Sequence, residues 1–267
     1  MNRTIRLFKR SLWLLLVVGL VACSSDAAEG EEPTPDQPDQ PEVEEPFTLR
    51  GKTIAILGDS YSTYAGWIPE GYLSWYAQDG TDGNNASKND VASVSDTWWH
   101  QLITAWECTL LMNSSYSGSP ICNTGYEGMD NARISFIARM KTDLNAAKCR
   151  PEVILILGGT NDHYAGAPCG APQYAAWTAR DLTQFCPAFC YMLDYLIGQH
   201  PTAKIVNVMN DCFSSEWAAL IRQMTTHYGV QNIALTNIKG SANLQGGHPT
   251  KATMKRIKEQ IEAALCQ

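Results

Sequence analysis

The chain has 267 residues, of which 45% are hydrophobic, and it carries 27 acidic against 20 basic side chains. This length is enough for a domain with a sizeable core. A protein that binds nucleic acid needs a basic surface, which this charge balance does not provide. We therefore expect no nucleic-acid partner.

Residues 1–22 have the pattern of an export signal. The first ten residues carry four basic side chains, Arg3, Arg6, Lys9 and Arg10. An apolar run over residues 12–21 follows, and it is shorter than the roughly 20 residues that a membrane-spanning helix needs. The run ends in Leu-Val-Ala before Cys23, which resembles the cleavage site of bacterial lipoproteins. That resemblance implies that Cys23 carries a lipid anchor; the alternative is a simple secretory signal.

Residues 23–46 are expected to form a tether. After Cys23 this segment holds nine acidic residues, several prolines and neither lysine nor arginine, so it cannot bury a core. The remaining 47–267 are expected to be one nearly neutral domain. We expect the protein to be exported and anchored by its lipid in a bacterial outer membrane, on the periplasmic face or at the cell surface.

Cysteine is frequent in the domain. With Cys23 set apart, eight remain: Cys108, Cys122, Cys149, Cys169, Cys186, Cys190, Cys212 and Cys266. An even number in an exported domain favours disulfides, up to four in all. The sequence leaves their pairing open.

The expected strands and helices alternate along 47–267. Short apolar runs predict strands at 53–57, 109–112, 153–157, 204–208 and 232–235. Helices are predicted at 95–105, 131–146, 172–199, 215–228 and 249–265, and a long loop at 61–94. This alternation predicts an α/β domain, with a parallel sheet covered by helices on both faces.

Polar residues and glycines follow the predicted strands. The first strand ends in Gly58-Asp59-Ser60, the second leads into 113–118 and the third into 158–162, while 246–249 precede the last helix. The carboxyl ends of parallel strands meet at one edge of a sheet, where ligands bind. We therefore expect a serine, a histidine and several hydrogen-bond donors to share that edge.

Four short blocks occur in a fixed order: Gly58-Asp59-Ser60, Asn113 to Gly118, Gly159-Thr160-Asn161-Asp162 and His248-Pro249. In these blocks the chain resembles the SGNH hydrolases, also called GDSL esterases. The resemblance implies a flavodoxin-like three-layer α/β/α sandwich with a mostly parallel five-stranded sheet. It also implies a carboxylic ester hydrolase that uses no cofactor and no metal.

The resemblance assigns roles to individual residues. Ser60 would be the nucleophile and His248 its general base, because a serine hydroxyl attacks poorly until a base takes its proton. The N–H groups of Ser60 and Gly118 and the side chain of Asn161 would form the oxyanion hole. Loss of one such donor typically slows catalysis by about 10²–10³.

Two positions depart from the family pattern. Tyr61 stands where the family usually has leucine, and Gln245 stands where it usually has an aspartate, three residues before the histidine. In a related triad, removing the charge of the acid lowers kcat by about 10⁴. We expect another group to orient His248, either Asp211 or, as in some family members, a backbone carbonyl. The alternative is a catalytically impaired protein.

The loop 61–94 is rich in aromatic residues: Tyr61, Tyr64, Trp67, Tyr72, Trp75 and Tyr76. Aromatic side chains beside a reactive serine favour a platform for sugar rings; the alternative is that they cover the loop's own small core. The residues predicted to contact substrate are Tyr61, Trp67, Trp75 and His163.

The sequence therefore predicts a serine esterase that removes acetyl or other acyl groups from a carbohydrate at the cell envelope. A general lipase, a short-chain esterase and a thioesterase are alternatives within the same chemistry. A second class of function is a surface glycan-binding lipoprotein that has the fold without the activity. A third is a structural envelope protein in which Ser60 has no chemical role.

Overall fold

The computed structural model describes residues 47–78 and 89–265. The predicted signal peptide 1–22, the tether 23–46 with its Cys23, and Cys266 lie outside the described residues, as do residues 79–88 of the long loop. No helix in the two described ranges combines the length and the apolar character that crossing a membrane requires.

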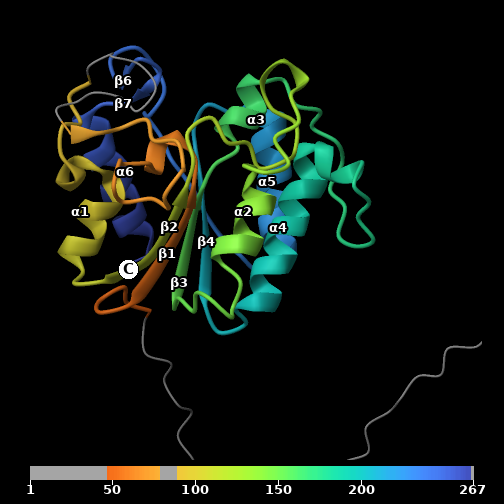
Figure 1. Cartoon of the computed structure of the whole chain (residues 1–267), viewed down its shortest axis with the longest axis horizontal. Coiled ribbons are helices and arrows are strands. Elements are labelled where there is room, and N and C mark those ends of the chain that lie inside the picture. Colours follow the sequence, from red (N-terminus) through yellow and green to blue (C-terminus); the bar gives the residue numbers. More distant parts are fainter. Residues whose placement is uncertain (1–46, 79–88, 266–267) are drawn as a thin grey trace, which may run out of the picture. The chain divides into compact units, whose positions relative to one another are not determined.

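A five-stranded sheet forms the centre of the domain (Figure 1). Its strands are β1 (Thr53–Gly58), β2 (Thr109–Ser115), β3 (Val153–Leu157), β4 (Lys204–Met209) and β5 (Gln231–Ala234). They lie in the order β2-β1-β3-β4-β5, and all four neighbouring pairs are parallel. This is the strand order of flavodoxin-like domains. The predicted α/β sandwich is confirmed.

Helices cover both faces of the sheet (Figure 1). On one face lie α1 (Trp98–Ala105) and α6 (Lys251–Leu265). On the other lie α2 (Phe136–Asp143), α4 (Phe185–Gln199) and α5 (Ser215–His227). The short helix α3 (Thr160–Tyr164) and the hairpin of β6 (Leu244–Gln245) and β7 (His248–Pro249) lie at the same end of the sheet. The described residues also form the 3-10 turns η1 (Ser60–Ser62), η3 (Val94–Asp96), η4 (Tyr126–Gly128) and η5 (Asp181–Thr183).

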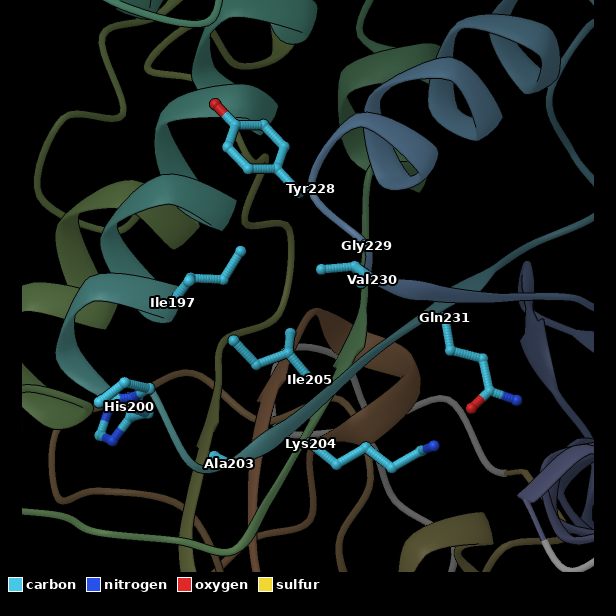
Figure 2. A pocket seen from close by; sticks show the side chains of 10 residues that line it. Ile197, His200, Ala203, Lys204, Ile205, Tyr228, Gly229, Val230 and Gln231 are labelled. Atoms are coloured by element: carbon cyan, nitrogen blue, oxygen red, sulfur yellow. The ribbon is translucent and has the colours of Figure 1, made fainter. Parts of the chain in front are cut away.

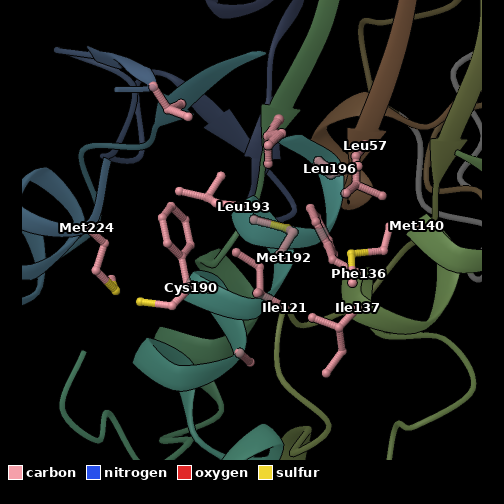
Figure 3. Packing of buried hydrophobic residues seen from close by; sticks show 14 of the residues in the cluster. Leu57, Ile121, Phe136, Ile137, Met140, Cys190, Met192, Leu193, Leu196 and Met224 are labelled. Carbon is pink, nitrogen blue, oxygen red and sulfur yellow. The ribbon is translucent and has the colours of Figure 1, made fainter. Parts of the chain in front are cut away.

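Two apolar cores lie between the sheet and its helices. Side chains of a strand alternate between the faces of a sheet. Ile54 and Ile56 of β1 therefore join the core under α1 and α6, whereas Leu57 joins the core under α2 and α4. Figure 3 shows Leu57 in that second core with Phe136 and Leu193. A strand that is buried on both faces holds the residues at its carboxyl end in a fixed place.

Some element boundaries differ from the prediction. The helix predicted over 172–199 begins only at Phe185, because Ala176 has a positive φ of 58° and the Asp181 carboxylate accepts from the Thr178 N–H instead of allowing a helical turn. The helix predicted over 131–146 is confined to 136–143. The second strand runs on to Ser115, so three polar residues belong to its carboxyl end.

Candidate active site

Ser60 stands at the carboxyl end of β1, on the first residue of η1. The preceding Gly58 has no space for a side chain, since a Cβ there would lie 2.5 Å from Ser115 Oγ and 2.6 Å from Ser62 Cβ. Asp59 then caps the turn, with its Oδ1 accepting from the Tyr61 N–H at 3.0 Å. The tight turn holds the predicted nucleophile on the edge of the sheet.

His248 is carried by the β6–β7 hairpin. Gln245 pairs with His248 across a turn of two residues, Gly246 and Gly247, with φ of 59° and 79°. Positive φ at both central residues is the requirement of a type I′ turn, which explains the two glycines. The hairpin places His248 Nε2 2.8 Å from Ser60 Oγ. Two residues that are 188 positions apart in the sequence thus form a hydrogen-bonded pair.

The second ring nitrogen of His248 fixes the tautomer. Nδ1 lies 2.9 Å from the carbonyl oxygen of Gly246. A carbonyl oxygen only accepts hydrogen bonds, so Nδ1 carries the proton and Nε2 of the neutral ring is the acceptor. The Ser60 hydroxyl therefore donates to Nε2, in the direction that proton transfer from serine to histidine requires.

The prediction that Asp211 orients His248 is corrected. Both oxygens of the Asp211 carboxylate accept from backbone N–H groups, those of Ile238 and Lys239, each at 2.9 Å. Asp211 thus orders the loop after β5, and the Gly246 carbonyl bonds to the imidazole instead. Gln245, in the position of the family's usual aspartate, accepts the Asp90 N–H on its Oε1 at 3.0 Å.

Two of the predicted substrate-contacting aromatics pack against the histidine. The indole of Trp75 stacks on the His248 ring with a centroid distance of 3.5 Å and an interplanar angle of 12°. The buried Tyr61 meets the same ring edge-on at 5.6 Å and donates its hydroxyl to the Gly247 carbonyl at 3.2 Å. The described part of the long loop therefore packs against the His248 ring, which stays partly exposed.

The other two predicted contacts lie elsewhere. Trp67 is 45% exposed and packs on Trp99 and His100 of α1. His163 follows Asn161 on α3, and its ring contacts Phe213, 5.7 Å away between centroids. Partial burial lowers the pKa of His163 below its usual value. Their contact with substrate stays a prediction.

The predicted oxyanion donors come from three loops that hydrogen bonds join together. Gly118 has a φ of 79°, in the region that favours glycine, and it follows the end of β2. Asn161 is buried on α3 and donates one N–H of Nδ2 to the Ser119 carbonyl at 3.0 Å. That bond ties Asn161 to the residue next to Gly118, while Ser60 lies at the adjacent strand end.

Sequence reasoning missed Tyr126. Its hydroxyl donates to Asn161 Oδ1 at 3.1 Å, while the amide nitrogen of Asn161 bonds to Ser119. The two bonds together fix which way the amide faces. Tyr126 lies on η4, in a stretch without regular periodicity, and the sequence carries no signal that could have assigned it.

Sequence reasoning also missed Arg139, a fully buried residue of α2. Its Nη2 donates to the Gly58 carbonyl and to Ser119 Oγ, each at 2.9 Å. Its Nη1 donates to the Ser114 carbonyl. Burial lowers the pKa of Arg139 to about 10, so the side chain stays charged at neutral pH. The one available signal was a charged residue between apolar neighbours, Phe136, Ile137 and Met140.

Two buried carboxyl groups support the loops. Burial raises the pKa of Asp59 to about 7 and that of Asp162 to about 6. Asp162 accepts the backbone N–H groups of Ile121 and Cys122 at 2.7 and 3.0 Å. Both act as acceptors that order the backbone, and neither contacts His248 in the described structure.

A cavity of about 230 Å³ lies at the opposite end of the sheet (Figure 2). Its lining includes Lys204 and Ile205 at the start of β4, Gln231 at the start of β5, and Ile197 of α4. These are the amino ends of parallel strands, whereas Ser60 follows a carboxyl end. The cavity is therefore separate from the Ser60–His248 pair.

Comparisons with known proteins show the family and the fold of the chain. The sequence model of the GDSL-like lipase/acylhydrolase family matches residues 52–265. A protein of Bacteroides uniformis described as a GDSL-like lipase is 41% identical, with a TM-score of 0.73 over 80% of this chain and 95% of that one. A counterpart from Bacteroides ovatus is 38% identical, with a TM-score of 0.72 over 80% and 97%.

A more distant structure shares the fold. An acetyl xylan esterase from the rumen bacterium Butyrivibrio proteoclasticus is 14% identical, with a TM-score of 0.51 over 80% of this chain and 63% of that one. No curated protein matches the sequence. The family match covers every block of the site, from Gly58 to Pro249. The chain belongs to the GDSL-like lipase/acylhydrolase family.

Proposed function

We propose that this protein is a serine esterase with Ser60 as nucleophile and His248 as general base. The observation that carries the proposal is the 2.8 Å hydrogen bond from Ser60 Oγ to His248 Nε2, with Nδ1 held by the Gly246 carbonyl. This geometry lets the ring accept the serine proton as the hydroxyl attacks.

The reaction proceeds through an acyl-enzyme. Ser60 Oγ attacks the ester carbonyl while its proton moves to His248 Nε2. The N–H groups of Ser60 and Gly118 and the Asn161 amide donate to the oxygen on which negative charge develops. His248 then gives its proton to the departing alcohol. In the second half, His248 takes a proton from water while the water oxygen attacks the acyl carbon. The bond from that carbon to Ser60 Oγ then breaks, His248 returns the proton to Ser60, and the acid is released.

We propose an acylated carbohydrate as the substrate. Three exposed apolar side chains, Tyr126, Met129 and Tyr164, lie on η4, on the residue after it and on α3, beside Asn161. Aromatic faces on the surface next to an oxyanion hole favour stacking with a sugar ring. The fold-level similarity to an acetyl xylan esterase supports an O-acetyl group. With the lipid on Cys23, the enzyme would act at the cell envelope.

The hydrogen bond from His248 Nδ1 to the Gly246 carbonyl argues against the alternative of a glycan-binding protein without activity. A protein that had lost catalysis would have no need for an oriented imidazole next to the serine. The bond from Nδ1 to the Gly246 carbonyl at 2.9 Å therefore favours the enzyme.

The test compares the intact chain with Ser60→Ala on p-nitrophenyl acetate and on acetylated xylan. We expect activity that the substitution abolishes, with faster turnover of the polysaccharide. Equal activity of both proteins would overturn the role of Ser60. Inactivity on both substrates, together with unaltered binding of acetylated xylan by the variant, would support the binding protein instead.

A further inference from the structure

The side chain of Trp75 lies in close contact with His248, the proposed base. The planes of the Trp75 indole and the His248 imidazole are nearly parallel, with an angle of 12° between them, and the ring centroids lie 3.5 Å apart. The indole also covers the turn that carries the histidine, since a Cβ on Gly246 would lie 3.2 Å from Trp75 Cζ2. Trp75 thus packs over both the ring and its supporting turn.

The backbone of Trp75 is tied to the nucleophile. Its N–H donates to Thr63 Oγ1 at 2.8 Å, and that hydroxyl donates to the Ser60 carbonyl at 3.0 Å. The next residue, Tyr76, donates its hydroxyl to the Pro249 carbonyl at 2.9 Å, directly after His248. The indole is therefore fixed relative to the serine and to the histidine at the same time.

The indole nitrogen of Trp75 indicates that the side chain is oriented by its stacking on His248. Within the described part of the chain, Trp75 Nε1 is buried and has no hydrogen-bond partner. Burying a donor without a partner is costly, and such a group in a folded protein calls for an explanation. Here the orientation that leaves Nε1 unsatisfied is the one that lays the indole on the imidazole.

We propose that Trp75 is a positioning residue for His248, which holds the imidazole toward Ser60 and stabilises its protonated form across the stacked ring face. This inference rests on the proposed esterase function. The indole face attracts cations more strongly than other aromatic side chains. The ring of His248 becomes a cation only when it takes the serine proton, so the interaction is stronger in the transition state than before it.

Two titratable aromatic side chains also meet the imidazole. They are Tyr61 and Tyr76, and the nearby carboxyl groups of Asp59 and Asp90 act on these tyrosines. Burial raises the pKa of both tyrosines well above their usual value, so both are neutral where the enzyme works. Asp59 and Asp90 are present in every variant below, so the variants differ from the wild type only at the substituted side chain.

The experiment measures kcat/KM against pH for the wild type, Trp75→Phe and Trp75→Leu, with Trp177→Leu as the control. Trp177 is also half-buried and contacts an aromatic ring, Tyr191, on α4. The acidic limb of such a profile reports the pKa of the base in the free enzyme. Stabilising the imidazolium raises that pKa, so its loss must lower it.

We expect Trp75→Leu to lose about tenfold in kcat, with the acidic limb moved to lower pH by about half a unit to one unit. For Trp75→Phe, both kcat and the pH of the acidic limb should lie between those of the wild type and Trp75→Leu. For Trp177→Leu, both should match the wild type. An unmoved acidic limb, or a rise in KM alone, would overturn the inference and make Trp75 a substrate contact or a packing residue.

A second measurement guards against misfolding. The His248 ring protons are titrated by NMR in Ser60→Ala and in the double variant Ser60→Ala, Trp75→Phe, where no turnover is needed. The inference requires a lower pKa in the double variant, and equal values would overturn it. If the proposed esterase function is wrong, activity will survive in Ser60→Ala. That result differs from equal His248 pKa values in the two variants, which would overturn only the role of Trp75.

Discussion

The hydroxyl of Tyr126 donates to Asn161 Oδ1 and so determines where the Asn161 amide nitrogen points. An amide can turn over and exchange its donor for its acceptor. With Oδ1 held by Tyr126 and Nδ2 bonded to the Ser119 carbonyl, the free N–H of Nδ2 faces one fixed direction. A correctly placed donor is worth far more to an oxyanion than one that is present only part of the time.

We therefore predict that Tyr126→Phe lowers kcat by about tenfold with little change in KM, because the ring remains and only the hydroxyl is lost. The check is steady-state kinetics on p-nitrophenyl acetate. Tyr195→Phe, a half-buried tyrosine of α4, is the matched control. A wild-type kcat in Tyr126→Phe would show that Asn161 holds its orientation without the hydroxyl.

Arg139 gives a prediction about stability. Its guanidinium bonds to Gly58 at the end of β1, to Ser114 of β2 and to Ser119 beyond it. A lysine keeps the charge but lacks the planar fork that reaches these acceptors together. Arg139→Lys should therefore lower the free energy of unfolding by about 2–3 kcal/mol, since buried carbonyls lose their donors.

The measurement is urea denaturation of both proteins, with the exposed Arg133→Lys as the control. We also expect a loss of activity at temperatures where Arg139→Lys is still folded, because the guanidinium joins the loops that carry Ser60 and Gly118. Full stability with full activity would mean that water or another donor replaces the fork.

The pairing of Ser60 with His248 could be predicted from the sequence because strand ends and short motifs are local features. Ser60 follows an apolar strand and a glycine, and the two glycines before His248 specify its tight turn. The partners of His248 and Asn161 are different. Trp75 and Tyr126 reach them across loops without periodicity, so nothing in the sequence marks their contacts. The assignment of Asp211 as the partner of His248 was wrong. A carboxylate near a strand end can accept hydrogen bonds from backbone N–H groups as well as from a histidine, and the sequence does not distinguish the two.

Asp59 predicts how stability depends on pH. Burial, above all, raises its pKa from 3.8 to about 7 in the folded protein. A carboxyl group with a raised folded pKa stabilises the protein below its unfolded pKa, and that contribution is lost as the pH rises through the folded value. The wild type should therefore lose stability between about pH 4 and pH 7, at about 1.4 kcal/mol for each pKa unit of the difference.

Asp59→Asn keeps the oxygen that accepts the Tyr61 N–H and removes the charge. We expect its Tm to fall less between pH 4 and pH 7 than that of the wild type, with the difference largest at neutral pH. The exposed Asp130→Asn should leave the wild-type slope unchanged. Parallel curves for the wild type and Asp59→Asn would show that Asp59 is ionised throughout this range.

The cysteines give the last prediction, which bears on the expected disulfides. Cys169 Sγ and Cys186 Sγ lie 3.7 Å apart, and the first is partly exposed while the second is buried on α4. A small rotation of the side chains would bring the two sulfurs to bonding distance. We predict that glutathione disulfide oxidises Cys169 and Cys186 to a disulfide bond and is itself reduced to two molecules of glutathione.

Peptide mapping without reduction would detect the link, and Cys186→Ser should abolish it while Cys190→Ser, one helical turn further along α4, should not. The closed loop is short, so the bond should stabilise the fold by about 3 kcal/mol. A link between Cys186 and Cys190, or two free thiols after oxidation, would contradict the prediction. Because the thiols are already adjacent in the folded chain, oxidation should proceed without denaturant, which separates this pair from cysteines that meet only on unfolding.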